Sequence, residues 1–133
     1  MYIIETYLDK STIHGIGVFS KEKILKDTLI WELSSYDHLF YMTKDKRMSN
    51  ASFPKTKSIY PFLKNFGYLD QHKRFICPAD NNAYVNHSFT PNTYEAEEGN
   101  KIYALRDIEK GEEITEDYTK FMDNDFFENL KIK

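Results

Sequence analysis

Short runs of apolar and β-branched residues, each ended by turn-forming residues, constrain the fold of this chain more than any other feature. Helical periodicity, with apolar residues three and four positions apart, is scarce along the sequence. Runs of about four to eight such residues between turn formers are typical of β-strands. The sequence therefore predicts a mostly β domain. The predicted strands are residues 2–8, 16–20, 28–33, 62–69, 74–77, 83–85, 93–97 and 102–108.

The length of the chain limits it to one domain. Its 133 residues are enough to build a hydrophobic core and too few for two independent cores. Aromatic residues make up 16% of the sequence and supply large side chains for that core. We therefore expect a single domain that spans residues 1–133.

Cysteine and histidine content argues against structural metal or disulfide chemistry. The single cysteine, Cys77, leaves no internal disulfide and no zinc site with several cysteines. We expect Cys77 to be a small buried hydrophobic residue, and a nucleophile built from Cys77 and His87 is the alternative. The four histidines show no metal-ligand spacing, so we expect no metal.

Neither a membrane span nor a targeting signal is visible in the sequence. No apolar run reaches the roughly 20 residues of a transmembrane helix, and the N-terminus has no cleavage pattern. We therefore expect a cytoplasmic or otherwise intracellular protein without a membrane partner.

Charge is distributed unevenly along the chain. The net charge is −3, so no overall basic field favours direct binding of nucleic acid. Residues 42–58 carry five basic side chains and one acid, and we expect a solvated surface there. Residues 112–128 carry seven acids and one lysine. This acidic tract is either a solvated surface or a face that attracts a cationic partner.

Turns and the two variable segments complete the outline. Turns are predicted at residues 27–28 and 110–111, and a hairpin tip at 99–100. Residues 44–58 are predicted to form a polar insertion. In the C-terminal segment 119–133, Asp125 and Glu128 have the spacing of a capping box, which predicts a short amphipathic helix that docks on the body.

Three clusters of polar or glycine residues stand out from this background. They are HGIGVF at residues 14–19, YVNHSFTPN at 84–92 and RDIEKGEEITEDY at 106–118. A pair of glycines at the start of a strand allows close approach of another chain or a ligand. No strand-to-helix GxGxxG is present, so a dinucleotide or phosphate loop is not supported.

Taken in order, the three clusters resemble the SET-domain protein lysine methyltransferases over almost the whole chain. The two most specific motifs are Asn86-His87-Ser88 with the Pro-Asn that follows, and GEEIT leading to Asp117-Tyr118. The resemblance implies a β-clip-like fold of several small sheets, with a C-terminal segment threaded through a loop, although knots are otherwise rare. The family usually has glycine at the position of Asp27.

The resemblance also implies a cofactor site. In the family, the Asn-His pair holds the adenosine end of S-adenosylmethionine and the glycine segment lies along the same cofactor. The expected architectural residues are Ser88, Pro91 and Asn92, and the residues expected to form turn and loop hydrogen bonds are Glu112, Glu113 and Asp117. The expected cofactor-binding residues are His14, Gly15, Ile16, Gly17, Asn86, His87 and Tyr118.

A catalytic role follows for one tyrosine. A sulfonium methyl is transferred in line to a lysine ε-amine, which must be neutral to act as a nucleophile although free lysine has a pKa of about 10.4. An apolar channel and the nearby sulfonium lower that pKa, and positioning supplies much of the remaining rate. The family points the hydroxyl of the tyrosine at position 118 toward the reacting centre, so Tyr118 is the expected catalytic residue.

The chain departs from the family around the lysine channel. A cysteine-rich zinc module that completes the channel in many relatives is missing, so Phe121, Phe126 and Phe127, or a second subunit of a homodimer, are candidates to close it. Glu116 stands where an aromatic residue often helps to set the number of methyl groups added. The expected substrate-binding residues are Glu116 and Phe121.

The resemblance thus implies an S-adenosylmethionine-dependent protein-lysine N-methyltransferase. Its partner would be a lysine-containing protein or peptide, with a basic histone tail as the family-based example. The alternative is a catalytically silent SET-like module that binds a peptide or cofactor without turnover.

Overall fold

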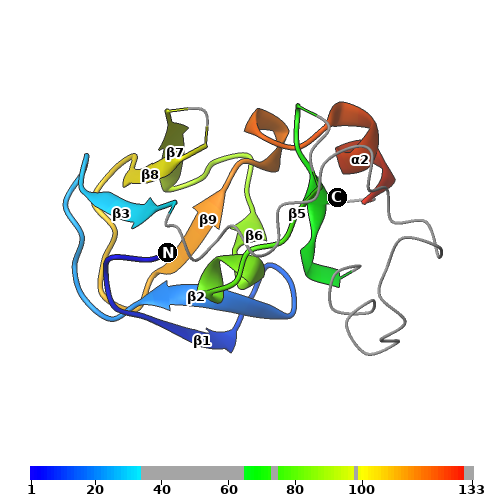
Figure 1. Cartoon of the computed structure of the whole chain (residues 1–133). Helices are drawn as coiled ribbons and strands as arrows, with labels where there is room; N and C mark the ends of the chain where they lie inside the picture. The colour runs from blue at the N-terminus through cyan, green and yellow to red at the C-terminus, as the bar shows by residue number, and fades with distance from the viewer. Residues whose placement is uncertain (34–64, 73–74, 98, 131–133) are drawn as a thin grey trace.

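The computed structural model describes residues 1–33, 65–72, 75–97 and 99–130. Small sheets dominate these residues, and two 3₁₀ helices and one short α-helix complete them (Figure 1). The insertion predicted at 44–58 and the last three residues of the C-terminal segment lie outside the described residues. The elements in chain order are β1 (Thr6–Lys10), β2 (Ile16–Ser20), β3 (Leu29–Glu32), β4 (Tyr68–Leu69), β5 (Phe75–Ile76), η3 (Asn81–Tyr84), β6 (Asn86–His87), β7 (Thr93–Ala96), β8 (Lys101–Ala104), β9 (Glu113–Glu116), η4 (Tyr118–Lys120) and α2 (Asn124–Asn129).

The strands form three separate sheets. One has four strands in the order β1-β2-β9-β6, one has three in the order β3-β8-β7, and β4 pairs with β5. Strand β9 runs antiparallel to β2 and parallel to β6, so a late strand lies between an early one and a middle one. This arrangement is consistent with the threaded C-terminal segment that the resemblance implies. It confirms a mostly β fold of several small sheets.

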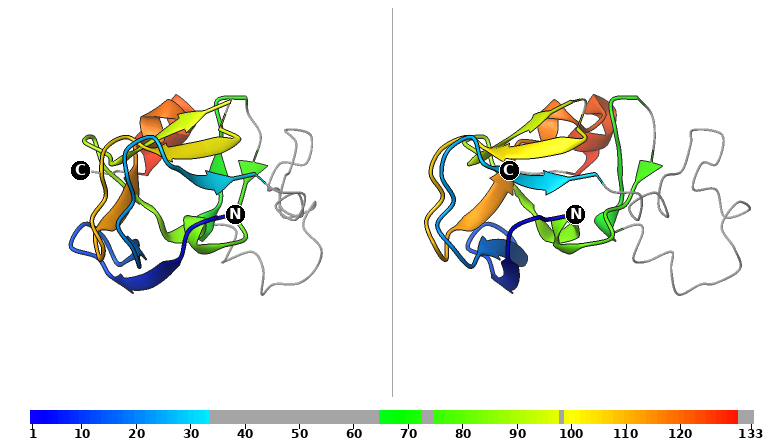
Figure 2. Two further views of the ribbon diagram at one scale, coloured as in Figure 1. Left: turned by 90° about the vertical axis from the view of Figure 1, so that its left-hand side faces the viewer. Right: turned by 60° about the vertical axis from the view of Figure 1, so that its left-hand side comes forward.

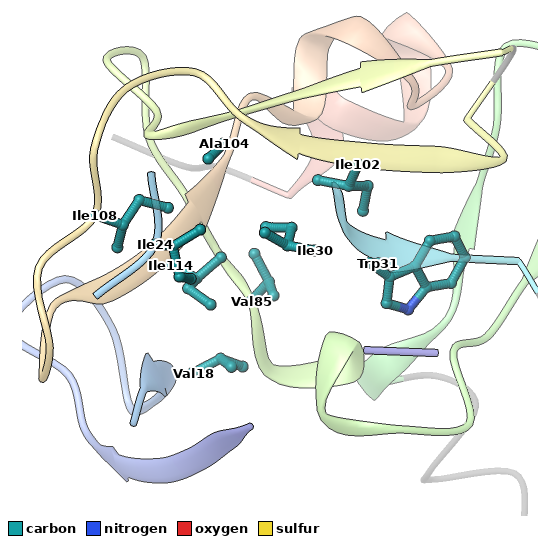
Figure 3. Packing of buried hydrophobic residues seen from close by; sticks show 9 residues of the cluster. All are labelled: Val18, Ile24, Ile30, Trp31, Val85, Ile102, Ala104, Ile108 and Ile114. Atoms are coloured by element: carbon teal, nitrogen blue, oxygen red, sulfur yellow. The ribbon is translucent and has the colours of Figure 1, made fainter. Parts of the chain in front are cut away.

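The core lies between the four-stranded and three-stranded sheets, which Figure 2 shows from two further directions. Figure 3 shows the core side chains between strands β3 and β8 on one side and β2 on the other. Ile30, Ile108 and Ile114 are fully buried in this cluster. Their burial fixes β9 in the middle of the molecule, because Ile114 belongs to that strand. The cluster consists of Val18, Ile24, Ile30, Trp31, Val85, Ile102, Ala104, Ile108 and Ile114.

The predicted turns are confirmed by backbone conformation. Gly99 and Gly111 have φ values of 84° and 80°, in the left-handed region that glycine adopts without strain. Asp27 also has a positive φ, 64°, which explains why glycine suits this position in related sequences. The hairpin around Gly99 joins β7 to β8 as predicted.

Several element boundaries differ from the predictions. The strand predicted at 83–85 is wrong, because the Asp80 side chain caps a 3₁₀ helix by accepting from the Asn82 N–H at 3.1 Å. Strand β9 was not predicted, since its sequence EITE carries two glutamates, which strands disfavour. Strand β1 begins at Thr6, and Tyr2 makes only an isolated bridge to Trp31.

The C-terminal helix α2 is confirmed, but its cap is not the expected one. The side chain of Asp123, and not Asp125, accepts from the backbone N–H of Phe126 at 3.2 Å. The segment before the helix is fastened to β4, where the Asp123 N–H donates to the Leu69 carbonyl at 2.8 Å. The residue that caps the helix therefore also fastens it to the body.

Candidate active site

Strand β9 brings the three sequence clusters together. Its parallel pairing with β6 places Thr115 opposite Asn86 and Glu116 opposite His87. Its antiparallel pairing with β2 places Ile114 opposite Val18, next to Gly17. The clusters at residues 14–19, 84–92 and 106–118 therefore lie side by side in one sheet.

The Asn86 side chain fastens the glycine segment to this sheet. Its amide nitrogen donates to the carbonyl oxygens of His14 at 3.0 Å and Ile16 at 3.2 Å. It also donates to Glu113 Oε1 at 2.8 Å, and the Ser11 hydroxyl donates to Glu113 Oε2 at 2.9 Å. Asn86 thus fixes the path of the backbone around Gly15, which the sequence alone did not reveal.

The structure explains why glycine is needed at both Gly15 and Gly17. Gly15 has a φ of 52°, in the left-handed region. A Cβ on Gly17 would lie 2.2 Å from Glu113 Oε1, which is closer than any real contact. Because the Glu113 carboxylate is held by Ser11 and Asn86, it is not free to move aside.

His87 is a neutral imidazole with an unused donor. Its Nδ1 accepts a hydrogen bond from the Tyr118 N–H at 3.1 Å, so the proton of the neutral ring lies on Nε2. Burial lowers the pKa of His87, against the opposing effect of Asp117, and this keeps the ring neutral. Among the described residues, Nε2 is buried without a hydrogen-bond partner. A buried unpaired donor is costly, and a ligand acceptor would satisfy it.

Aromatic rings surround His87. Its ring lies 4.4 Å from Phe89, 5.2 Å from Tyr118 and 5.3 Å from Phe127, measured between ring centroids. Phe89 is nevertheless 65% exposed. An exposed aromatic ring beside an unpaired donor is suited to cover a ligand that enters from solvent.

Tyr118 begins η4 immediately after the acidic end of β9. Its hydroxyl donates to the backbone carbonyl of Val85, and its ring packs against Phe121 at a centroid distance of 5.6 Å. Burial raises the pKa of Tyr118, and the nearby Glu116 carboxyl raises it further, so the phenol is neutral. The hydroxyl oxygen keeps acceptor capacity while its proton is directed at Val85.

The polar residues around these side chains are architectural, as predicted. Asn92 ties its loop to β9 by accepting from the Thr115 N–H at 2.9 Å and donating to the Glu113 carbonyl at 2.7 Å. Glu112 forms an ion pair with Arg106 at 2.6 Å. Burial would raise the pKa of Glu112, but the hydrogen bond from Arg106 helps to hold that pKa below its usual value. Asp117 caps η4 by accepting from the Thr119 N–H at 3.0 Å. Cys77 is buried as expected, and burial raises the pKa of its thiol to about 11.

A cavity of about 760 Å³ brings most of the predicted site residues together. This volume lies in the range of small-molecule sites. Gly15, Ile16 and Gly17, which were also expected to bind the cofactor, do not line the cavity. The expected residues that line it are His14, Asn86, His87, Glu116, Tyr118 and Phe121.

A second cavity, of about 830 Å³, shares part of this wall. Glu116 and Phe121 line both cavities, together with residues that the sequence did not single out. Phe126 lines the first cavity, whereas Phe127 packs on the His87 ring. The shared residues that sequence reasoning missed are Trp31, Tyr68, Pro78, Asn82, Phe89, Glu95 and Gly99.

Two further features were sought in the described part of the chain. There, no helix combines the length and the hydropathy that a membrane span requires. Within the same residues, histidine, cysteine, aspartate and glutamate side chains form no group of three or more that could hold a metal ion.

Comparison with known proteins identifies the family. A model of the SET domain matches residues 15–119. Histone-lysine N-methyltransferase 2D of Homo sapiens is 29% identical over 118 residues, and its Mus musculus counterpart gives the same values. The aligned region is 84% of this chain and 2% of each of those proteins.

Solved structures share the fold. Chaetomium thermophilum Polycomb Repressive Complex 2 bound to GSK126 aligns with a TM-score of 0.63 and 20% identity, covering 96% of this chain and 17% of that one. The same complex in an autoinhibited conformation bound to S-adenosylmethionine aligns with a TM-score of 0.64 and 19% identity, covering 96% and 16%. Because the family model covers most of the sequence and these structures share its fold, the chain belongs to the SET domain family.

Proposed function

We propose that this chain transfers the methyl group of S-adenosylmethionine to the ε-amine of a lysine in a protein substrate. The observation that carries this proposal is the cavity lined by His14, Asn86, His87 and Tyr118, where the buried donor at His87 Nε2 has no partner among the residues that the structure describes. Relatives named histone-lysine N-methyltransferase and a structure of the same fold bound to S-adenosylmethionine support it.

The cofactor would lie between β6 and the His14 segment. When bound, S-adenosylmethionine supplies an electrophilic methyl group. The unpaired Nε2–H of His87 would donate to it, and the Asn86 amide would hold the backbone of residues 14–16 in place. The Phe89 ring, which is exposed, would exclude water from one side of the ligand.

The substrate amine would approach from the second cavity. Phe121 and Tyr68, whose rings lie 5.2 Å apart, line it and provide an apolar wall that disfavours an ammonium ion. The Tyr118 phenol remains neutral, and its oxygen is available to accept a hydrogen bond from the amine. Positioning of the amine by this group would supply much of the rate.

The substrate class is a lysine-containing protein segment. The exposed acids of residues 112–128, Asp125 and Glu128, favour a basic segment such as a histone tail. The relatives' printed names agree with this class.

Methyl transfer itself tests the proposal. The purified chain is incubated with S-adenosylmethionine labelled in its methyl group and with a mixture of histones, and modified residues are mapped by mass spectrometry. Label on lysine Nε is expected with the wild type and with Tyr103→Phe, which changes a tyrosine outside both cavities. Tyr118→Phe is expected to lose it. Cofactor binding without label on any lysine would favour a silent binding module.

A further inference from the structure

Glu116 is a buried carboxyl in the wall of both cavities. Its residue is only 5% exposed, and among the described residues its Oε1 atom is buried without a hydrogen-bond partner. Its backbone is fixed, since its carbonyl accepts from the Ser88 N–H at 2.9 Å. The side chain lies in the wall shared by both cavities. Burying such an oxygen unpaired is unfavourable, which indicates that a ligand satisfies it.

A second carboxyl lies in the same wall. Glu95 belongs to β7, is half-buried and also lines both cavities. Its side chain reaches toward the hairpin tip, where Oε2 would lie 3.4 Å from a Cβ on Gly99. In the described part of the chain neither Glu95 nor Glu116 forms an ion pair, whereas Glu97 nearby pairs with Lys101 at 2.9 Å.

Among the described residues, the other charged groups near Glu116 do not neutralise it. Asp80 is engaged by the backbone N–H groups of Tyr2 at 2.9 Å and Asn82 at 3.1 Å. Lys120 lines the second cavity and is exposed. The remaining titratable groups on the two cavity walls or in the electrostatic surroundings of Glu116, among the described residues, are Tyr2, His14, Tyr68, Asp70, His72, Cys77, His87, Tyr94, Glu97, Asp117 and Tyr118.

The protonation of the two carboxyls follows from their surroundings. Burial raises the pKa of Glu95 to about 7. Burial, followed by the charges of Glu95 and Asp80, raises the pKa of Glu116 well above its usual value. Two carboxyls that share one site retain a proton because both cannot ionise cheaply. The empty site therefore holds at least one proton at neutral pH.

We propose, building on the methyl transfer proposed above, that Glu116 and Glu95 form the site that binds the primary amine of the substrate, and that amine binding displaces a proton from this acid pair. The O–H bond of the carboxylic acid breaks, its proton passes to solvent, and an N–H of the ammonium group donates to the carboxylate oxygen. The departing proton balances the charge that the amine brings. Before methyl transfer that N–H bond breaks and its proton passes to the carboxylate oxygen. The apolar wall of Phe121 and Tyr68 favours the neutral amine that results.

The pair also distinguishes between amines. A primary ammonium has N–H donors for the unpaired Glu116 oxygen, whereas a quaternary ammonium has none. A trimethylated amine would leave that oxygen unsatisfied, which costs affinity. The site therefore favours lysine that carries few methyl groups.

The test uses n-butylammonium chloride as the probe, with the purified full chain at neutral pH. NMR chemical shifts of the backbone amides report affinity, and a pH-stat reports protons released. The wild type is expected to bind n-butylammonium more tightly than n-butyltrimethylammonium and to release about one proton per amine bound. Absence of proton release, or equal binding of the two amines, would overturn the proposal.

Isosteric variants assign the effect to the two carboxyls. Glu116→Gln is expected to weaken n-butylammonium binding about tenfold or more and to abolish proton release. Glu95→Gln is expected to weaken binding less and to reduce the release. The matched control is Glu22→Gln, an exposed glutamate outside both cavities, and it should behave as wild type. If folded Glu116→Gln binds n-butylammonium as tightly as the wild type, the assignment of the amine site to Glu116 and Glu95 is overturned. If Glu116→Gln does not fold, wild-type affinity for n-butylammonium in Glu95→Gln overturns it.

A parallel titration with S-adenosylmethionine separates this proposal from the proposed function. Amine binding with proton release in a chain that neither binds the cofactor nor transfers methyl would refute the function and retain the acid pair. Methyl transfer that is unchanged in Glu116→Gln, with unchanged KM for the peptide, would refute the acid pair and retain the function.

Discussion

Gly17→Ala should destabilise the protein through one side chain, the Glu113 carboxylate. The added methyl group would lie 2.2 Å from Glu113 Oε1, 2.7 Å from its Cδ and 3.2 Å from its Cγ. Gly17 lies in β2 without a positive φ, so alanine adopts this backbone without strain. The whole effect therefore comes from displacing a carboxylate that Ser11 and Asn86 hold.

The magnitude follows from those two hydrogen bonds. Each joins a donor to a charged acceptor and contributes about 1.5–3 kcal/mol. Losing both, minus the roughly 0.5–1 kcal/mol gained by replacing glycine with alanine in a strand, predicts a loss of about 2–5.5 kcal/mol in the free energy of unfolding. In the Glu113→Ala background the carboxylate is already gone. There, Gly17→Ala should be neutral or should stabilise the fold by up to about 1 kcal/mol.

Urea unfolding of the four proteins of this double-mutant cycle measures the coupling. A coupling free energy of about 2 kcal/mol or more between the two positions is expected. Gly15→Ala serves as a comparison, because it adds a methyl into open space at a φ of 52° and should cost about 1–2 kcal/mol in both backgrounds. If Gly17→Ala costs the same with and without Glu113, the contact is not the reason for the glycine.

Three further predictions concern chemistry, stability and charge. Tyr118→Phe should lower kcat by about 100-fold with little change in KM, because the hydroxyl would act mainly in the transition state. Steady-state kinetics checks this, with Tyr103→Phe as the control. A kcat equal to that of the wild type would exclude a catalytic role for the Tyr118 hydroxyl. Because the pKa of Glu95 is raised to about 7 in the folded protein, its contribution to stability is full below pH 4.5 and is lost as pH rises through about 7. Glu95→Gln should therefore flatten the dependence of the free energy of unfolding on pH in this range. An unchanged dependence would contradict the burial of this carboxyl. The KM for a basic peptide should rise with salt, because ions screen the exposed Asp125 and Glu128 over about 8–10 Å. A KM that does not change with salt would mean that these two acids belong to an ordinary solvated surface.

Local signals predicted the elements that local chemistry determines. Strand β2 (Ile16–Ser20) was predicted with its observed bounds, and the turn at Gly111 follows from its conformational freedom. The helix α2 was predicted from its amphipathic face, although its cap lies two residues earlier, at Asp123. Several acidic residues in this segment have the spacing of a helix cap, so the spacing alone could not distinguish Asp123 from Asp125 as the capping residue.

Elements that depend on distant partners were harder to predict. Strand β9 has the polar sequence EITE and is a strand because β2 and β6 pair with it on both sides. The 3₁₀ helix at Asn81–Tyr84 depends on Asp80, whose carboxylate also accepts from Tyr2, 78 positions away. No local pattern contains such a contact.

In the candidate site, too, local motifs predicted some residues and missed others that depend on distant partners. The motifs pointed to His14, Asn86, His87 and Tyr118, which share one cavity. They could not reveal Glu95, which lies on a hairpin that no motif includes. Nor could the motifs show that the Asn86 amide donates hydrogen bonds to the backbone carbonyls of His14 and Ile16.

The central claim is that this cavity binds S-adenosylmethionine, and isothermal titration calorimetry tests it most directly. The wild type is expected to bind one cofactor per chain. Asn86→Ala leaves three acceptors without their shared donor, which should lower the free energy of unfolding by about 1–3 kcal/mol. Because two of these acceptors hold the His14 segment of the cavity wall in place, the variant that still folds should also bind the cofactor more weakly. No binding by the wild type, or an affinity unchanged in folded Asn86→Ala, would contradict the account.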